Sequence, residues 1–263
     1  MTYEELLDDL KKTVSKAMNP DSKDLLILYG SAACGKTTSD FDFCFVRETP
    51  RAGDAARIEQ AALNFHHKNG LKVDEEVPYS NKLLYSKKDL VQAVYFGPFE
   101  KKDGLPQIDP IEKTPEFLSS PQIKKRLLFN MMTTPSRLLL GDEALFNRYK
   151  TVAFETLVDI MFSYEHALPM SQQGLLSRLL TDSRSGRSGE DFLGYKKEKP
   201  AVVSYLTEQI DDSFVRLTEK GRLKKQQDGT FLYTPSKEFP HPVIIATQPR
   251  IGEKSEKKQH EQE

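Results

Sequence analysis

Hydrophobic residues near the start of the chain recur at the spacing of an α-helix. In residues 3–18 the apolar positions are Leu6, Leu7, Leu10, Val14 and Met18. Side chains three or four residues apart lie on one face of a helix, so this pattern predicts an amphipathic helix that ends before Asn19-Pro20. Similar patterns predict a helix over 54–69, ending before Gly70, and another over 87–96.

Two segments between these helices have the patterns of β-strands. Residues 24–29 form an apolar run, which is typical of a buried strand. Residues 40–46 alternate instead, with phenylalanine at 41, 43 and 45 on one side and aspartate or cysteine on the other. This period of two predicts a strand with one apolar face. Residues 71–77 and 82–85 predict two further, short strands.

The rest of the chain has mainly helical patterns. Residues 97–121 are rich in proline and lysine, which predicts a linker or a long loop. Helices are predicted after it over 122–131, 136–165 with breaks, 171–182 and 198–218. Residues 231–233 and 243–246 predict a small hairpin near the end of the chain.

This order of elements predicts an α+β fold. We expect a small mixed-sheet domain with flanking helices over 1–112, followed by a mainly helical domain over 113–249. Residues 250–263 are rich in lysine, glutamate and glutamine and have no apolar anchor, so we expect a disordered tail there.

Composition narrows the possible locations and partners. The formal net charge is −1, so no overall positive field favours a long nucleic acid or a membrane surface. No apolar run approaches membrane-spanning length, and the first residues are acidic and amphipathic, unlike a signal peptide. The two cysteines, Cys34 and Cys44, have no metal-binding or redox spacing. We therefore expect a cytoplasmic protein without a membrane partner.

Two phosphate-handling motifs overlap in residues 30–42. One is Gly30-Ser31 followed by Asp40-Phe41-Asp42, and the other is the P-loop pattern that ends in Gly35-Lys36-Thr37. A P-loop needs a helix of several turns after Thr37 and a crossover to a parallel strand. Because the next predicted strand begins at Asp40, there is no room for that crossover. The two carboxylates are therefore the favoured motif.

Asp40 and Asp42 lie on the same face of the predicted strand, because side chains alternate along it. Two neighbouring carboxylates repel each other unless cations neutralise them. Mg2+ prefers carboxylate oxygens, and a pair of such ions suits in-line displacement at phosphorus. Upstream, Gly30 permits a close approach of the backbone, and we expect Ser31 to cap a short helix whose N–H groups hold phosphates.

This arrangement resembles the nucleotidyltransferase superfamily, which includes DNA polymerase β, poly(A) polymerases and aminoglycoside nucleotidyltransferases. The shared motif is an apolar strand, Gly-Ser, a short helix and Asp-x-Asp on the next strand; Ser39, just before the first acid, also fits. The resemblance implies that Asp40 and Asp42 bind two Mg2+ ions. It also implies that Gly30 and Ser31 hold the phosphates of a nucleoside triphosphate such as ATP.

The superfamily also uses a third carboxylate on a neighbouring strand, and residues 71–77 hold the candidates. Asp74 and Glu76 share one face of that predicted strand. By the resemblance, Asp74 is the favoured third catalytic and metal-binding residue, and Glu76 is the second choice. Lys82, at the end of this segment, is a candidate for contact with the triphosphate.

The expected activity is Mg-dependent transfer of a nucleoside monophosphate to a hydroxyl acceptor, with release of pyrophosphate. The acceptor is expected to be a small molecule or a protein, since the near-neutral charge makes a long nucleic acid less favoured. Two alternatives remain open. One is a P-loop kinase or NTPase that uses Lys36 and Thr37, and the other is a nucleotidyltransferase-like module that binds without turnover.

Overall fold

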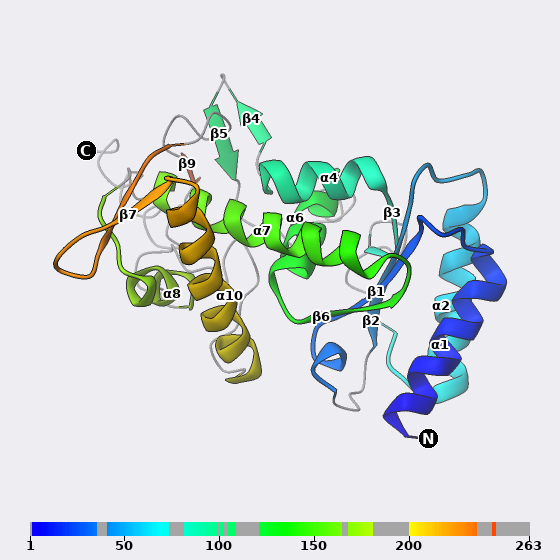
Figure 1. The fold of residues 1–263 in the computed structure, drawn as a ribbon. Helices are drawn as coiled ribbons and strands as arrows, with labels where there is room; N and C mark the ends of the chain where they lie inside the picture. The colour runs from blue at the N-terminus through cyan, green and yellow to red at the C-terminus, as the bar shows by residue number, and fades with distance from the viewer. Residues whose placement is uncertain are drawn as a thin grey trace, which may run out of the picture.

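The computed structural model describes residues 2–35, 41–73, 82–98, 100–102, 105–108, 121–164, 168–180, 200–235 and 244–245. The fold is α+β, as predicted. A four-stranded mixed sheet lies between two layers of helices, and further helices extend away from one layer (Figure 1).

The sheet has the strand order β3-β2-β1-β6. The strands are β1 Leu25–Tyr29, β2 Asp42–Arg47, β3 Leu84–Ser86 and β6 Ser136–Leu140. Strand β1 is antiparallel to both β2 and β6, whereas β2 and β3 are parallel. Tyr29, the last residue of β1, is in register with Asp42 on one side and with Ser136 on the other.

One face of the sheet is covered by α1 (Tyr3–Met18) and α2 (Asp54–Asn69) (Figure 1). Helix α1 begins with a capping box between Thr2 and Glu5. The three phenylalanines of residues 41–45 pack beneath these helices and are almost completely buried, with exposed fractions of 0–1%. The alternating pattern therefore predicted the inward face of β2 correctly.

The other face of the sheet is covered by α4 (Lys87–Phe96), α6 (Pro121–Thr133) and α7 (Glu143–Tyr164). Cys44 and Val46 of β2 are buried there, so both faces of this strand are apolar away from its start. The prediction of a single apolar face was wrong because helices from the second half of the chain cover the other one. The Cys44 Sγ lies 3.3 Å from the Met131 Sδ of α6.

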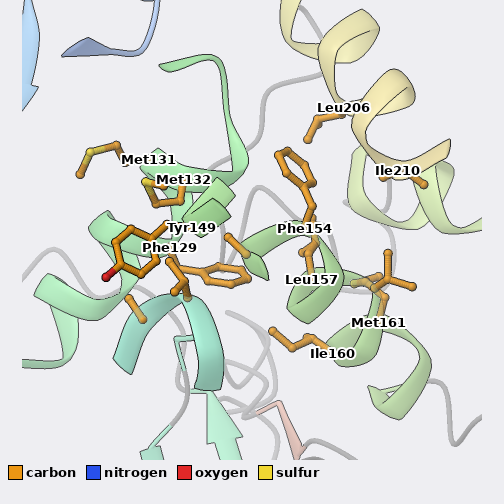
Figure 2. Close-up of a cluster of buried hydrophobic side chains, with 14 of the residues drawn as sticks. Phe129, Met131, Met132, Tyr149, Phe154, Leu157, Ile160, Met161, Leu206 and Ile210 are labelled. Atoms are coloured by element: carbon orange, nitrogen blue, oxygen red, sulfur yellow. The ribbon is translucent and has the colours of Figure 1, made fainter. Parts of the chain in front are cut away.

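The same core continues away from the sheet. Figure 2 shows α6, α7 and α10 (Pro200–Glu219) contributing side chains to one apolar cluster. Helix α8 (Gln172–Leu180) packs against α10. A hairpin of β7 (Leu223–Lys225) and β8 (Phe231–Tyr233) closes this end, where Phe231 and Phe214 pack edge to face with ring centroids 4.8 Å apart.

A buried arginine joins the starts and ends of four elements near the end of β2. The Arg47 side chain is 2% exposed and forms ion pairs with Asp24 at 3.0 Å and with Asp54 at 2.9 Å. It also donates to the Met18 carbonyl oxygen at the end of α1, at 2.7 Å. One guanidinium therefore connects the end of α1, the start of β1, the end of β2 and the start of α2.

Most of the predicted helices are confirmed, but three predictions differ from the structure. Residues 136–140 form β6 rather than the start of a helix, because they pair with the distant β1. Strand β8 pairs with β7, whereas β9 (Ile244–Ile245) is parallel to β5 (Leu105–Ile108). Residues 71–73 are not a strand, and the rest of the strand predicted over 71–77 lies outside the described residues.

The segment expected to be a linker, 97–121, contains β4 (Glu100–Lys102) as well as β5, and these two strands form a small antiparallel pair. The division at 112/113 stays a prediction. Strand β6, from beyond that division, nevertheless supplies an edge strand to the sheet formed by the first segment. The tail predicted for 250–263 lies outside the described residues.

Candidate functional site

Three polar side chains form a row across one end of the sheet. Asp42 begins β2, Tyr29 ends β1 and Ser136 begins β6, and the register places them on neighbouring strands. Residues in register share one face of a sheet. This is the face covered by α4, α6 and α7, because Cys44 and Ile27 lie one pleat further along it. The row therefore lies at the edge of this buried face, at the end of the sheet where β1 ends and β2 and β6 begin.

Gly30 turns the chain directly beside Asp42. Its backbone has φ +73°, in the left-handed region that favours glycine. A Cβ at this position would lie 3.3 Å from the Asp42 Oδ2, a close contact. The described neighbour of this glycine corner is therefore the carboxylate of Asp42, whereas the predicted approach of the backbone to phosphates stays a prediction. Asp42 itself is half-buried.

The short helix after Gly30 is a single 3-10 turn, Ala32–Cys34. Ser31 precedes it with helical backbone angles and its side chain makes no capping hydrogen bond, so the predicted cap is wrong. The turn is fixed instead by the Tyr3 hydroxyl, which donates to the Ala32 carbonyl oxygen at 2.7 Å. Gly35, with φ +77°, ends the turn.

Lys82 lies two residues before β3 and is 5% exposed, so it is not a solvated surface lysine. The neighbouring Leu83 carbonyl oxygen accepts a hydrogen bond from the Phe45 amide of β2 at 2.7 Å. Lys82 is therefore next in sequence to a residue that is hydrogen-bonded to β2, the strand that begins with Asp42.

The other predicted site residues lie outside the described residues. They are Ser39, Asp40, Asp74 and Glu76, and the P-loop residues Lys36 and Thr37. Among the described residues, no group of three or more His, Cys, Asp or Glu side chains is arranged to hold a metal ion. Of the predicted metal ligands, the structure therefore places only Asp42.

Asp42 fits the role of one ligand for Mg2+. Its carboxylate offers the hard oxygen donors that this ion prefers. The absence of a side chain on Gly30 leaves space beside Oδ2, since a Cβ there would occupy the approach to this oxygen. The remaining ligands, by the sequence prediction, are Asp40 and Asp74 or Glu76.

Two polar residues in or near this row, Lys150 and Ser136, were not singled out from the sequence. Lys150, on α7, is 9% exposed, and its Nζ donates to the Ser136 Oγ at 2.9 Å. The ammonium also lies 4.7 Å from the centroid of the Tyr205 ring. Burial lowers the pKa of Lys150 to about 8. No local signal identifies this lysine, because its surroundings come from β6 and α10, which are distant in the sequence.

Comparison with known proteins found no similar family model, no similar curated protein and no similar solved structure. Across the described ranges, none of the helices combines the length and the apolar character that crossing a membrane requires.

Proposed function

We propose that this protein is a Mg-dependent nucleotidyltransferase that moves a nucleoside monophosphate from a nucleoside triphosphate to a hydroxyl group. The proposal is supported mainly by one observation, the carboxylate of Asp42 held above the Gly30 corner at the start of an antiparallel strand. This geometry agrees with the Gly-Ser and Asp-x-Asp motif of the superfamily that the sequence resembles.

The pairing of β1 and β2 argues against the P-loop alternative. A P-loop is followed by a helix that crosses back to a parallel strand. Here β2 begins at Asp42, five residues after Thr37, and it is antiparallel to β1. The loop between them is too short to hold both a helix of several turns and a crossover.

The proposed reaction joins the oxygen of the acceptor hydroxyl to the α-phosphorus and breaks the bond to the β-phosphate. Pyrophosphate leaves with the electron pair of that bond, and the hydroxyl proton passes to a nearby carboxylate or to solvent. Bound Mg2+ would neutralise the negative charge of the phosphates and lower the pKa of the acceptor hydroxyl. The ions would be held by Asp42 and Asp40, together with Asp74 or Glu76. The proposed phosphate contacts are Gly30, Ser31, Ser39 and Lys82.

The acceptor in this proposal is a small molecule or a protein in the cytoplasm. The net charge of −1 supplies no extended positive field for a long nucleic acid. The described charges agree with this choice, because several basic side chains of α10 and its flanks pair with acids. Lys220 contacts Glu155 at 2.6 Å, and Arg222 contacts Asp159 at 2.7 Å.

Incubation with Mg2+ and each α-labelled nucleoside triphosphate, with and without a cell extract, tests the proposal. We expect pyrophosphate release and labelling of an acceptor. Asp42→Asn should lower the rate by at least about a hundredfold, because the uncharged amide is a poor ligand for Mg2+ where charge develops. The melting temperature should change little, since Asp42 lies at the half-buried end of its strand.

Two matched variants make the result specific. Asp211→Asn removes one exposed carboxylate from α10 and should leave the rate unchanged. Lys36→Ala should also leave pyrophosphate release largely intact. If Lys36→Ala abolishes activity and the product is orthophosphate, the P-loop alternative is correct. If nucleotide binds but label never reaches an acceptor, the protein is a binding module.

A further inference from the structure

A cavity of about 630 Å3 lies beside α7, between the end of α4 and the turn that follows α10. One wall is formed by residues of α7 spaced three or four apart, because side chains at this spacing share a face of a helix. The Thr156 Oγ1 donates to the Val94 carbonyl oxygen at 2.7 Å, which attaches the end of α4 to α7. Cavities of this volume are typical of sites for small molecules.

Five charged side chains among the described residues line this cavity, and four of them neutralise one another. Lys220 pairs with Glu155 at 2.6 Å, and Arg222 pairs with Asp159 at 2.7 Å. The fifth is Arg148, which is exposed and makes no ion pair with any acid in the described part of the chain. The lining therefore has an excess of one positive charge.

Two further pairs near the cavity leave this excess in place. Arg216 adds a second cation to Glu155, at 3.4 Å. Glu48 is the acid whose charge acts on Tyr149, the residue next to the uncompensated arginine, and it is paired with Lys87 at 3.0 Å. Neither contact supplies an acid that would neutralise the cavity.

An aromatic ring lies near this arginine. Tyr95, at the end of α4, lines the same cavity and is 36% exposed. Burial is the main cause of the raised pKa of Tyr149; Tyr95 raises it further and Arg148 lowers it, so both lie within electrostatic reach of one phenol. Val152 and Leu217 add apolar surface to the lining. The cavity thus combines a ring, an aliphatic surface and an uncompensated guanidinium.

These groups define the chemistry of a ligand. A guanidinium binds a carboxylate, sulfonate or phosphate through paired hydrogen bonds, and a tyrosine ring packs against flat apolar groups. We propose that the cavity binds a small organic anion, whose aromatic body lies against Tyr95 and Val152 and whose acidic group pairs with Arg148. This inference is independent of the proposed function, since no residue of β1, β2 or β6 lines the cavity.

Two dyes with the same ring system test the site. 8-Anilino-1-naphthalenesulfonate is an aromatic anion, and N-phenyl-1-naphthylamine lacks its sulfonate. Fluorescence titration of the folded protein measures both affinities. Arg148→Met keeps most of the side chain and removes its charge. It should weaken binding of the sulfonate by at least about tenfold and leave binding of the neutral dye unchanged.

Two further variants make this result specific. Tyr95→Ala should weaken the binding of both dyes by about fivefold, because the ring that packs against them is lost. Arg51→Met is the matched control, since it removes an exposed guanidinium from the loop before α2, and it should bind both dyes normally. Amide NMR spectra locate the bound sulfonate, and we expect the largest shifts at Thr151 and Val152.

The inference fails if the unmodified protein does not bind the sulfonate, or if Arg148→Met binds it equally well. It also fails if Arg51→Met weakens binding as much as Arg148→Met, because the effect would then reflect overall charge. Both Arg148 and Tyr95 are exposed, so the melting temperature without dye should not change. If a variant does not fold, the NMR shifts of the unmodified protein decide, and shifts confined to other elements reject the site.

Discussion

At the scale of single residues, Gly30 links backbone conformation to the position of a carboxylate. Its positive φ and the 3.3 Å distance from a would-be Cβ to the Asp42 Oδ2 are separate constraints. The first would affect stability, because an L-residue is strained in this conformation. The second would affect activity, because the carboxylate must move to make room.

Gly30→Ala should therefore lower both stability and activity. We expect a loss of about 1–2 kcal/mol in the free energy of unfolding, measured with urea, from the left-handed backbone. Pyrophosphate release should fall by at least about tenfold as Asp42 is displaced.

Gly70→Ala separates these two effects. Gly70 ends α2 with φ +63°, and nothing lies within 4 Å of its would-be Cβ. This variant should lose similar stability and keep full activity. If both variants keep full activity, the contact between Gly30 and Asp42 has no functional role.

The sequence drew attention to Gly30 and Asp42 because their motif is local, with all its residues in one short segment of the chain. It could not identify Lys150 in the same way. The contacts of this lysine come from Ser136, fourteen positions earlier, and from Tyr205 on α10. A lone lysine on a helix is usually solvated, and only the packing of β6 and α10 around this one makes it different.

At the scale of elements, the Arg47 cluster holds the ends of β2 and α2 in place. Burial would raise the pKa of the Asp54 carboxyl, yet the Arg51 amide and the Arg47 guanidinium together hold the pKa below its ordinary value of 3.8. The ionised form is thus favoured in the fold. Its stabilising contribution is complete above pH 3.8 and is lost as the pH falls through the lower folded pKa.

Arg47→Met should be strongly destabilising. The change leaves the Asp24 and Asp54 carboxylates buried without their shared cation, and we expect a loss of about 3–5 kcal/mol in the free energy of unfolding. Denaturant titration at pH 7 measures the loss. Repeating it at lower pH should show a smaller deficit, because protonation removes the uncompensated charge.

Arg57→Met is the control for this cluster. Arg57 also contacts Asp54, but 46% of its side chain is exposed. Pairs of this kind contribute about 0–1 kcal/mol. A loss from Arg57→Met as large as that from Arg47→Met would show that the buried position of Arg47 is not the source of the stability.

Local patterns predicted elements well where contacts are local, and less well where strands pair over long distances. The helices α1, α2 and α4 have strong periodicity or clear caps, and all three form as expected. Strand β6 was mistaken for helix because Ser-Arg-Leu-Leu-Leu has no alternation, and its conformation is set by pairing with β1. The hairpin partner predicted for β8 was also wrong. The true partner is β7, and Asp228-Gly229, just before β8, is a recognisable turn signal for that hairpin.

At the scale of the whole molecule, the sheet needs both halves of the sequence. The apolar face of β1 and β2 is covered by α6 and α7, and β6 forms the edge. We therefore expect a fragment of residues 1–112 to remain largely unfolded, because one side of its sheet is exposed to water. Amide dispersion in NMR spectra and hydrogen exchange measure this directly. A well-dispersed, protected fragment would instead support an independent domain with the boundary predicted from the sequence.

The return of β6 to β1 also has a consequence for biosynthesis. Tyr29 and Ser136 are neighbours in space but more than a hundred positions apart in the chain. A ribosome therefore releases Asp42 and the glycine corner long before it releases the strand and helix that complete the row. The nascent polypeptide must hold an unfinished sheet in solution during translation, and the row of Asp42, Tyr29 and Ser136 can assemble only after β6 has emerged.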